Sequence, residues 1–173
     1  MVRRPNTVGG GAQTNLNGLE FERNSDILKM IETQTNYTVR GQQIFDRQNT
    51  HVGTYFEKHN FYKDFLQPRG VDFRKVISSK LLPDGVIVTG DTVYVVEMKY
   101  QNGPGSVDEK LQTCDFKKRQ YQKLCYPIGY NVEYIYLLND WFNQRKFLDV
   151  FEYINSVGCH YFIGTLPLEI FGL

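Results

Sequence analysis

Hydrophobic and polar residues alternate most regularly over residues 81–100, whose sequence is LLPDGVIVTGDTVYVVEMKY. Two runs rich in β-branched residues flank Gly90–Asp91. A glycine followed by an aspartate suits the two-residue type I′ or II′ turn that joins antiparallel strands. The pattern therefore predicts a β-hairpin whose turn lies at these two positions.

This turn fixes which residues of the hairpin face each other. Counting outward from it, Val86 faces Val95 and Asp84 faces Glu97. Paired side chains project to the same face of a sheet, with Cβ atoms about 4.5–5.5 Å apart, and alternation along the strand puts Lys99 on that face too. Two carboxylates and one ammonium group are predicted to converge there.

Helical periodicity is expected in three other segments. In the first, 17–33, Asn17 is a candidate N-cap with Glu20 three residues later, and isoleucines and a leucine supply an apolar stripe. The second, 106–124, opens with the capping box SVDE. The third, 141–157, follows an asparagine and an aspartate that are candidate N-caps, and ends before a glycine.

Two further strands are predicted at 130–138 and 160–163, where aromatic and β-branched residues gather. Residues 34–80 stay open, because YTVRGQQIF alternates like a strand whereas TYFEKHNFYKDFL fits a helix or a strand. The order of elements predicts an α/β fold with a mixed central β-sheet flanked by helices.

Composition narrows the class of protein. A chain of 173 residues that is 41% hydrophobic forms one core, so we expect a single domain over 17–173 after a flexible Gly-rich arm at 1–16. No window approaches the roughly 18 apolar residues of a membrane span, and three cysteines without CxxC spacing indicate reduced thiols. We expect a soluble, cytoplasmic protein without a membrane partner. The net charge of +1 means that any polyanion must be bound by local basic clusters.

The converging charges of the hairpin need compensation. Like charges directly opposite each other destabilise a sheet, and flanking valines would partly desolvate them. A hard divalent cation such as Mg²⁺ takes carboxylate and carbonyl oxygens and keeps positions open for phosphate. This predicts hydrolysis of a phosphodiester. The alternative is a simple bend at Asp84–Gly85 and an exposed Glu97/Lys99 ion pair that contributes under about 1 kcal/mol.

The combination of Pro83–Asp84 with Glu97-Met98-Lys99 resembles the PD-(D/E)XK nuclease superfamily, and the chain looks most like a type II restriction endonuclease within it. The resemblance covers approximately 17–138 and implies a restriction-endonuclease-like core. It implies that Asp84, Glu97 and the Met98 carbonyl bind Mg²⁺ and that Lys99 orients the attacking water.

The implied activity is site-specific cleavage of double-stranded DNA that leaves 5′-phosphate ends. A homodimer and a cognate DNA methyltransferase are the implied partners. Two alternatives stay open: a structure-specific or repair nuclease such as a Holliday junction resolvase, and a catalytically silent DNA-binding module of the same fold.

Further site residues are weaker candidates. By resemblance, Glu20 would be an additional helical carboxylate near the metal, although it fits a capping box equally well. Residues suited to base recognition are Arg40, Gln42, Gln43, Arg47, Gln48 and Asn49. Candidates for phosphate contact are Gln101, Asn102, Ser106, Lys117, Lys118 and Arg119. The alternatives are a solvated strand end for Gln101, a plain turn with an N-cap for Asn102 and Ser106, and a solvated helix face for the three cations.

Overall fold

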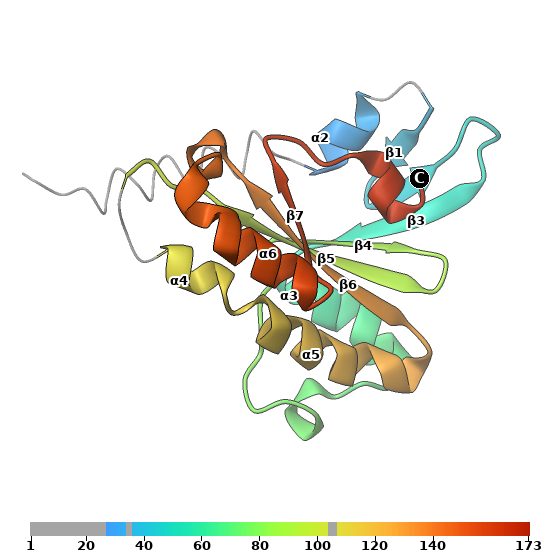
Figure 1. Cartoon of the computed structure of the whole chain (residues 1–173). Helices are drawn as coiled ribbons and strands as arrows, with labels where there is room; N and C mark the ends of the chain where they lie inside the picture. The colour runs from blue at the N-terminus through green and yellow to red at the C-terminus, as the bar shows by residue number, and fades with distance from the viewer. Residues whose placement is uncertain (1–26, 34–35, 104–106) are drawn as a thin grey trace, which may run out of the picture.

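In the part of the chain that the structure describes, seven strands form one mixed sheet at the centre of the molecule (Figure 1). The computed structural model describes residues 27–33, 36–103 and 107–173. Strands β1 to β5 pair antiparallel with their neighbours, and β5, β6 and β7 pair in parallel. The predicted α/β fold with a mixed sheet flanked by helices is confirmed at this level. The predicted arm at 1–16 and the first part of the predicted helix 17–33 lie outside the described residues.

The segment that the sequence left open contributes three strands and a helical stretch. The strands are β1 (Thr38–Arg40), β2 (Gln43–Phe45) and β3 (His51–Phe56). A left-handed glycine, Gly41 with φ of 62°, lies in the turn between the first two. After β3 the chain forms α3 (Lys58–Asn60), a π-helical turn (Phe61–Leu66) and a 3₁₀ turn (Gln67–Arg69). The ambiguous stretch is thus a strand followed by a helix.

The predicted hairpin has the predicted register. Strand β4 (Gly85–Thr89) pairs with β5 (Thr92–Lys99) so that Thr89 faces Thr92 and Val86 faces Val95. Gly90, with φ of 54°, supplies the left-handed conformation that the turn needs. Because Gly85 faces Val96, Asp84 lies one position beyond the ladder, level with Glu97.

The helix predicted at 106–124 is wrong as a continuous element. The structure has α4 (Val107–Leu111) and α5 (Cys114–Cys125) with a break between them. At the break the Thr113 hydroxyl donates to the Lys110 carbonyl at 2.7 Å, and the Thr113 N–H donates to the same oxygen at 3.3 Å. A threonine that bonds the backbone in this way competes with the helical ladder.

The helix predicted at 141–157 is also shorter than expected. Helix α6 spans Leu148–Ser156, and two 3₁₀ turns, Asp140–Phe142 and Arg145–Phe147, precede it. Gln144 has an extended backbone, with φ of −134° and ψ of 145°, which separates the two turns.

Among the helices of the described residues, none has both the length and the apolar character needed to span a membrane.

Helices cover both faces of the sheet, which is completed by β6 (Asn131–Leu138) and β7 (His160–Ile163). Helices α5 and α6 pack with the aromatic residues of 61–66 on one face. The short helix α2 (Ile27–Glu32) and the C-terminal turn Leu168–Phe171 pack on the other. The three cysteines are free and buried on the α5 side.

Alternation along β5 decides which charged groups meet which helix. Val93 and Val95 belong to the core beneath α5, whereas Val96 and Met98 belong to the opposite core. Glu97 and Lys99 share the parity of Val95 and therefore project toward α5.

A glycine beside the first aspartate allows α2 to pack closely against the hairpin. A Cβ at Gly85 would lie 2.7 Å from Ile27 Cδ1 and 3.1 Å from the Tyr55 ring. We expect Gly85→Ala to lower the free energy of unfolding by about 1–3 kcal/mol through overpacking. Gly103, where an added Cβ has no neighbour within 4 Å, is the control. Urea unfolding checks this, and equal stabilities of Gly85→Ala and Gly103→Ala would contradict it.

Candidate active site

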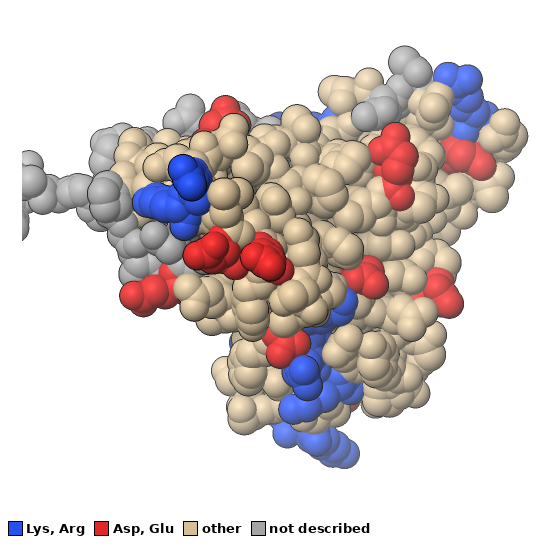
Figure 2. All heavy atoms as spheres, in the orientation of Figure 1, with Lys and Arg blue, Asp and Glu red and all other residues tan. Residues whose placement is uncertain are grey.

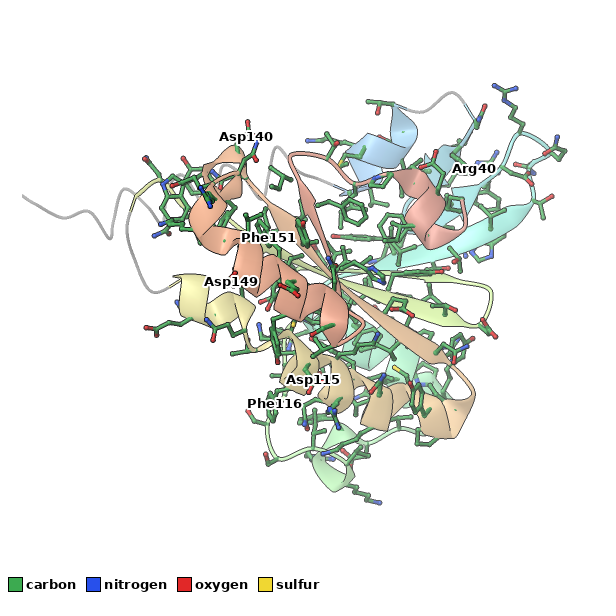
Figure 3. The ribbon with its side chains drawn as sticks, viewed as in Figure 1. Arg40, Asp115, Phe116, Asp140, Asp149 and Phe151 are labelled. Atoms are coloured by element: carbon green, nitrogen blue, oxygen red, sulfur yellow. The ribbon has the colours of Figure 1, made fainter. Side chains whose placement is uncertain are left out.

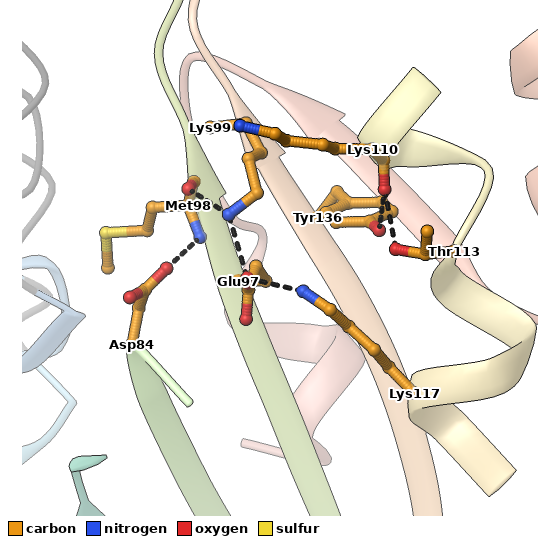
Figure 4. A network of polar contacts seen from close by, with 8 residues as sticks. All are labelled: Asp84, Glu97, Met98, Lys99, Lys110, Thr113, Lys117 and Tyr136. Carbon is orange, nitrogen blue, oxygen red and sulfur yellow. Dashed lines mark hydrogen bonds and ion pairs between the residues drawn. The ribbon is translucent and has the colours of Figure 1, made fainter. Parts of the chain in front are cut away.

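Asp84 is held at the entrance of β4 by contacts to both neighbouring strands. Its Oδ2 accepts a hydrogen bond from the Met98 N–H at 2.8 Å (Figure 4). The preceding carbonyl, of Pro83, accepts the Lys58 N–H at 2.9 Å, and the Tyr55 hydroxyl approaches the Asp84 carbonyl at 3.5 Å. The chain on both sides of Asp84 is thus fixed, and its carboxylate lies against the Met98 peptide of β5.

Glu97 is bound by two ammonium groups through one oxygen. Lys99 Nζ and Lys117 Nζ each lie 2.8 Å from Glu97 Oε1 (Figure 4). The Glu97 side chain is 12% exposed. Burial raises the pKa of the Glu97 carboxyl, but the charges and hydrogen bonds of Lys99 and Lys117 outweigh it, so the pKa lies below its ordinary value. Glu97 is therefore ionised at neutral pH.

Lys99 connects the carboxylate to the backbone. Its Nζ donates to Glu97 Oε1 at 2.8 Å and to the Met98 carbonyl at 3.0 Å. Its ammonium group therefore lies between two oxygens that the sequence assigned to a metal ion. Oxygens that hold one cation in this way suit another hard cation.

The donor atoms of the site are of the kind that Mg²⁺ prefers. Asp84, Glu97 and the Met98 carbonyl together offer oxygen atoms alone. No cluster of three or more histidines, cysteines, aspartates or glutamates that would suit a metal occurs in the described parts of the chain. Mg²⁺ commonly takes one or two carboxylates and fills its remaining positions with water and phosphate, so two carboxylates with a carbonyl suffice.

Lys117 has a different position from the one that the sequence suggested. It was expected in a phosphate-binding patch with Lys118 and Arg119, but these three cations bind three different carboxylates. Lys118 lies 3.0 Å from Glu133, and Arg119 lies 3.0 Å from Asp115. Lys117 instead extends from α5 to Glu97. The structure thus places Lys117 in the Asp84/Glu97/Lys99 site.

A sequence signal for this position exists in the periodicity of α5. Lys117 follows the buried Cys114 by three residues and precedes the buried Tyr121 by four. Residues at these spacings share one helix face. Lys118, four residues after Cys114 and three before Tyr121, shares this face and its side chain is 13% exposed, whereas the Arg119 side chain is 69% exposed. The periodicity therefore indicates that Lys117 and Lys118 face inward, but it does not say which carboxylate each one binds.

Gln101 closes the strand ends beside the site. Its N–H donates to Asn139 Oδ1 at 2.9 Å, and Asn139 Nδ2 donates to the Gln101 carbonyl at 2.9 Å. Gln101 is 6% exposed as a residue, and its side-chain amide donates to the Gly103 carbonyl at 2.7 Å. Asn139, considered in the sequence as a helix cap, therefore links β5 to β6. Asn102 is exposed in the following loop, and Ser106 and Glu20 lie outside the described residues.

The six candidates for base recognition fall into two groups. Arg40, Gln42 and Gln43 lie at the turn between β1 and β2, whereas residues 47–49 lie at the turn between β2 and β3. These turns are at opposite ends of β2. In Figure 3, Arg40 also lies well away from Asp115 of α5, near which the predicted phosphate contacts Lys117, Lys118 and Arg119 are found. The structure does not gather the predicted DNA contacts on one surface.

The molecular surface agrees with this dispersion. On the face shown in Figure 2, acidic side chains are spread over the middle of the molecule and basic ones gather mainly toward its lower end. A broad uninterrupted basic surface is not seen on this face.

Comparisons with known proteins do not assign the chain. No protein-family model, curated protein or solved structure matches it. The chemistry of the site therefore has to be argued from its residues.

The lowered pKa of Glu97 predicts that the stability of the protein depends on pH. Because Glu97 has a lower pKa in the folded than in the unfolded chain, its contribution to stability is present above the ordinary glutamate value, about 4.3, and is lost as the pH falls through the folded value. We expect Glu97→Gln to cost about 1.5–3 kcal/mol at pH 7. This cost should shrink toward pH 3.

Urea unfolding of the wild type and the variant across this pH range measures the effect. Glu152→Gln, on an exposed position of α6, controls for the loss of one titrating group. A difference between wild type and Glu97→Gln that is constant with pH would refute the role of the two lysines.

Proposed function

We propose that this protein is a Mg²⁺-dependent endonuclease that hydrolyses phosphodiester bonds of double-stranded DNA. The observation that carries the proposal is the gathering of Asp84, Glu97 and Lys99 around the Met98 peptide, at the ends of two adjacent strands. Two acids and a lysine beside one peptide could hold a divalent metal ion and orient a water molecule for attack on phosphorus.

Each residue has a role that its contacts support. Asp84, Glu97 and the Met98 carbonyl would hold Mg²⁺, which when bound lowers the pKa of a water molecule and polarises a phosphoryl oxygen. Lys99, whose ammonium reaches both Glu97 and Met98, would orient the attacking water or neutralise charge that develops on the phosphate. The Met98 N–H orients the Asp84 carboxylate for this task.

The contacts disfavour the simpler interpretation of an exposed ion pair. An exposed pair joins two mobile side chains in water and contributes little. Here one carboxylate that is 12% exposed is shared by two lysines that are 19% and 24% exposed. Such a group needs its partners, because an ionised carboxylate shielded from water is costly without them. The lysines nevertheless keep enough exposure to meet a ligand.

Sequence specificity, a symmetric dimer and a partner methyltransferase belong to the same proposal through the resemblance to type II restriction endonucleases. A two-fold dimer would present two copies of the site to the two strands of a duplex. The predicted base contacts lie at both ends of β2, so they do not indicate which DNA sequence is recognised. The recognition sequence has to be read from the ends of the cleaved DNA fragments.

Cleavage of plasmid and phage DNA with Mg²⁺ tests the proposal. We expect the wild type to give discrete fragments with 5′-phosphate ends. Asp84→Asn and Lys99→Met should lose activity by about 10²–10⁴-fold, because they remove metal-ligand charge and stabilisation of the transition state. Replacing Mg²⁺ by Ca²⁺ should preserve DNA binding with little turnover. Gel analysis with end sequencing measures the fragments and the activity of the variants, and a gel mobility shift measures DNA binding in Ca²⁺.

Other results of this assay have definite meanings. A smear of fragments favours a repair nuclease, and selective cleavage of four-way junctions over linear duplex favours a resolvase. DNA binding by the wild type without cleavage favours a silent binding module. Full activity in both variants would reject the site.

A further inference from the structure

Two ammonium groups share a single carboxylate oxygen in this site. Both lie 2.8 Å from Glu97 Oε1, one from the same strand and one from α5 (Figure 4). With Asp84 at the other side of the Met98 peptide, the group contains two negative and two positive charges. The lysines thus already supply the compensation that the converging acids require.

A divalent cation on Glu97 would upset this balance. Adding two positive charges to a neutral group leaves a net charge of +2 close to both lysines, and repulsion between cations is strong where water is scarce. This repulsion is relieved if one lysine moves away from Glu97 or if an anion binds beside the site. Metal binding and lysine contact are therefore in competition for the same carboxylate.

The two lysines differ in how firmly they are held. Lys99 has a second acceptor, the Met98 carbonyl at 3.0 Å. In the described part of the chain, the ammonium of Lys117 contacts Glu97 alone. Its side chain is 24% exposed and has a flexible four-carbon stem. Lys117 is consequently the lysine that can leave at lower cost.

We propose that Lys117 is a displaceable counter-ion that competes with the divalent cation for Glu97 and, once displaced, binds a phosphate of the DNA. This inference rests on the proposed nuclease function and adds a positioning role that it does not require. Metal and DNA should then bind cooperatively: the metal releases the lysine for the phosphate, and the phosphate draws the lysine away from the metal site. By linkage, each ligand raises the affinity for the other by the same factor.

Calorimetric titration of Ca²⁺ into the full chain, without DNA and at pH 8, tests the competition. We expect Lys117→Met and Lys117→Gln to bind Ca²⁺ about tenfold more tightly than the wild type, because a charge-assisted hydrogen bond no longer competes. Lys123→Met, at an exposed position of the same helix, should leave the affinity unchanged. Two variants of different polarity, each checked by circular dichroism, separate competition from misfolding.

The same titration with a short DNA duplex present tests the coupling. DNA should tighten Ca²⁺ binding in the wild type and should do so much less in both Lys117 variants. Unchanged or weaker Ca²⁺ binding by the Lys117 variants, in a wild type that binds metal and cleaves DNA, would overturn this inference and leave the nuclease proposal standing. A wild type that neither binds a divalent cation nor cleaves DNA would overturn both.

Discussion

The pairing of β4 with β5 is the constraint on which the rest of the site depends. A two-residue turn at Gly90–Asp91 sets that pairing, and alternation then puts Asp84 level with Glu97. A slip of one residue would turn Glu97 to the opposite face of the sheet. There the neighbours are the apolar core that includes Met98 and Leu137, with no lysine of α5 within reach. The local turn therefore decides whether the carboxylates can act together.

The parallel half of the sheet supplies what the hairpin lacks. After β5 the chain crosses over the sheet through α4 and α5 before it enters β6, and this crossover brings Lys117 over Glu97. The reciprocal hydrogen bonds between Gln101 and Asn139 hold the ends of β5 and β6 together beside the site. An antiparallel hairpin and a parallel crossover thus meet where the charges gather. A partly desolvated carboxylate is stable there because two lysines reach it.

Local patterns predict the parts of this arrangement that local forces determine. The hairpin and its register follow from alternation and turn chemistry, and β6 and β7 follow from their aromatic and β-branched residues. All of these signals lie in neighbouring residues. The two helices were predicted too long because the interrupting residues, Thr113 and Gln144, have no strong propensity against helix. The hydrogen bond from the Thr113 hydroxyl to the backbone interrupts the first helix, and the extended backbone of Gln144 interrupts the second. Neither feature can be seen in the spacing of hydrophobic residues.

Contacts distant in the sequence explain the remaining differences. The spacing of Lys117 and Lys118 from Cys114 and Tyr121 indicates that both face inward, but it does not distinguish the partner of one from the partner of the other. The pairing of Lys117 with Glu97 depends on how the crossover packs, as does the pairing of Gln101 with Asn139. The order of three cations along a helix says nothing about which of three carboxylates each will bind. Tertiary packing makes that choice.

The most direct test of this account is the position of a divalent metal in a crystal. Crystals of the full chain soaked in Mn²⁺ should show an anomalous peak that contacts the carboxylates of Asp84 and Glu97 and the Met98 carbonyl, with Lys117 moved away from Glu97. Manganese bound elsewhere, or no peak beside an unchanged Lys117–Glu97 contact, would contradict the claim that this register builds a metal site.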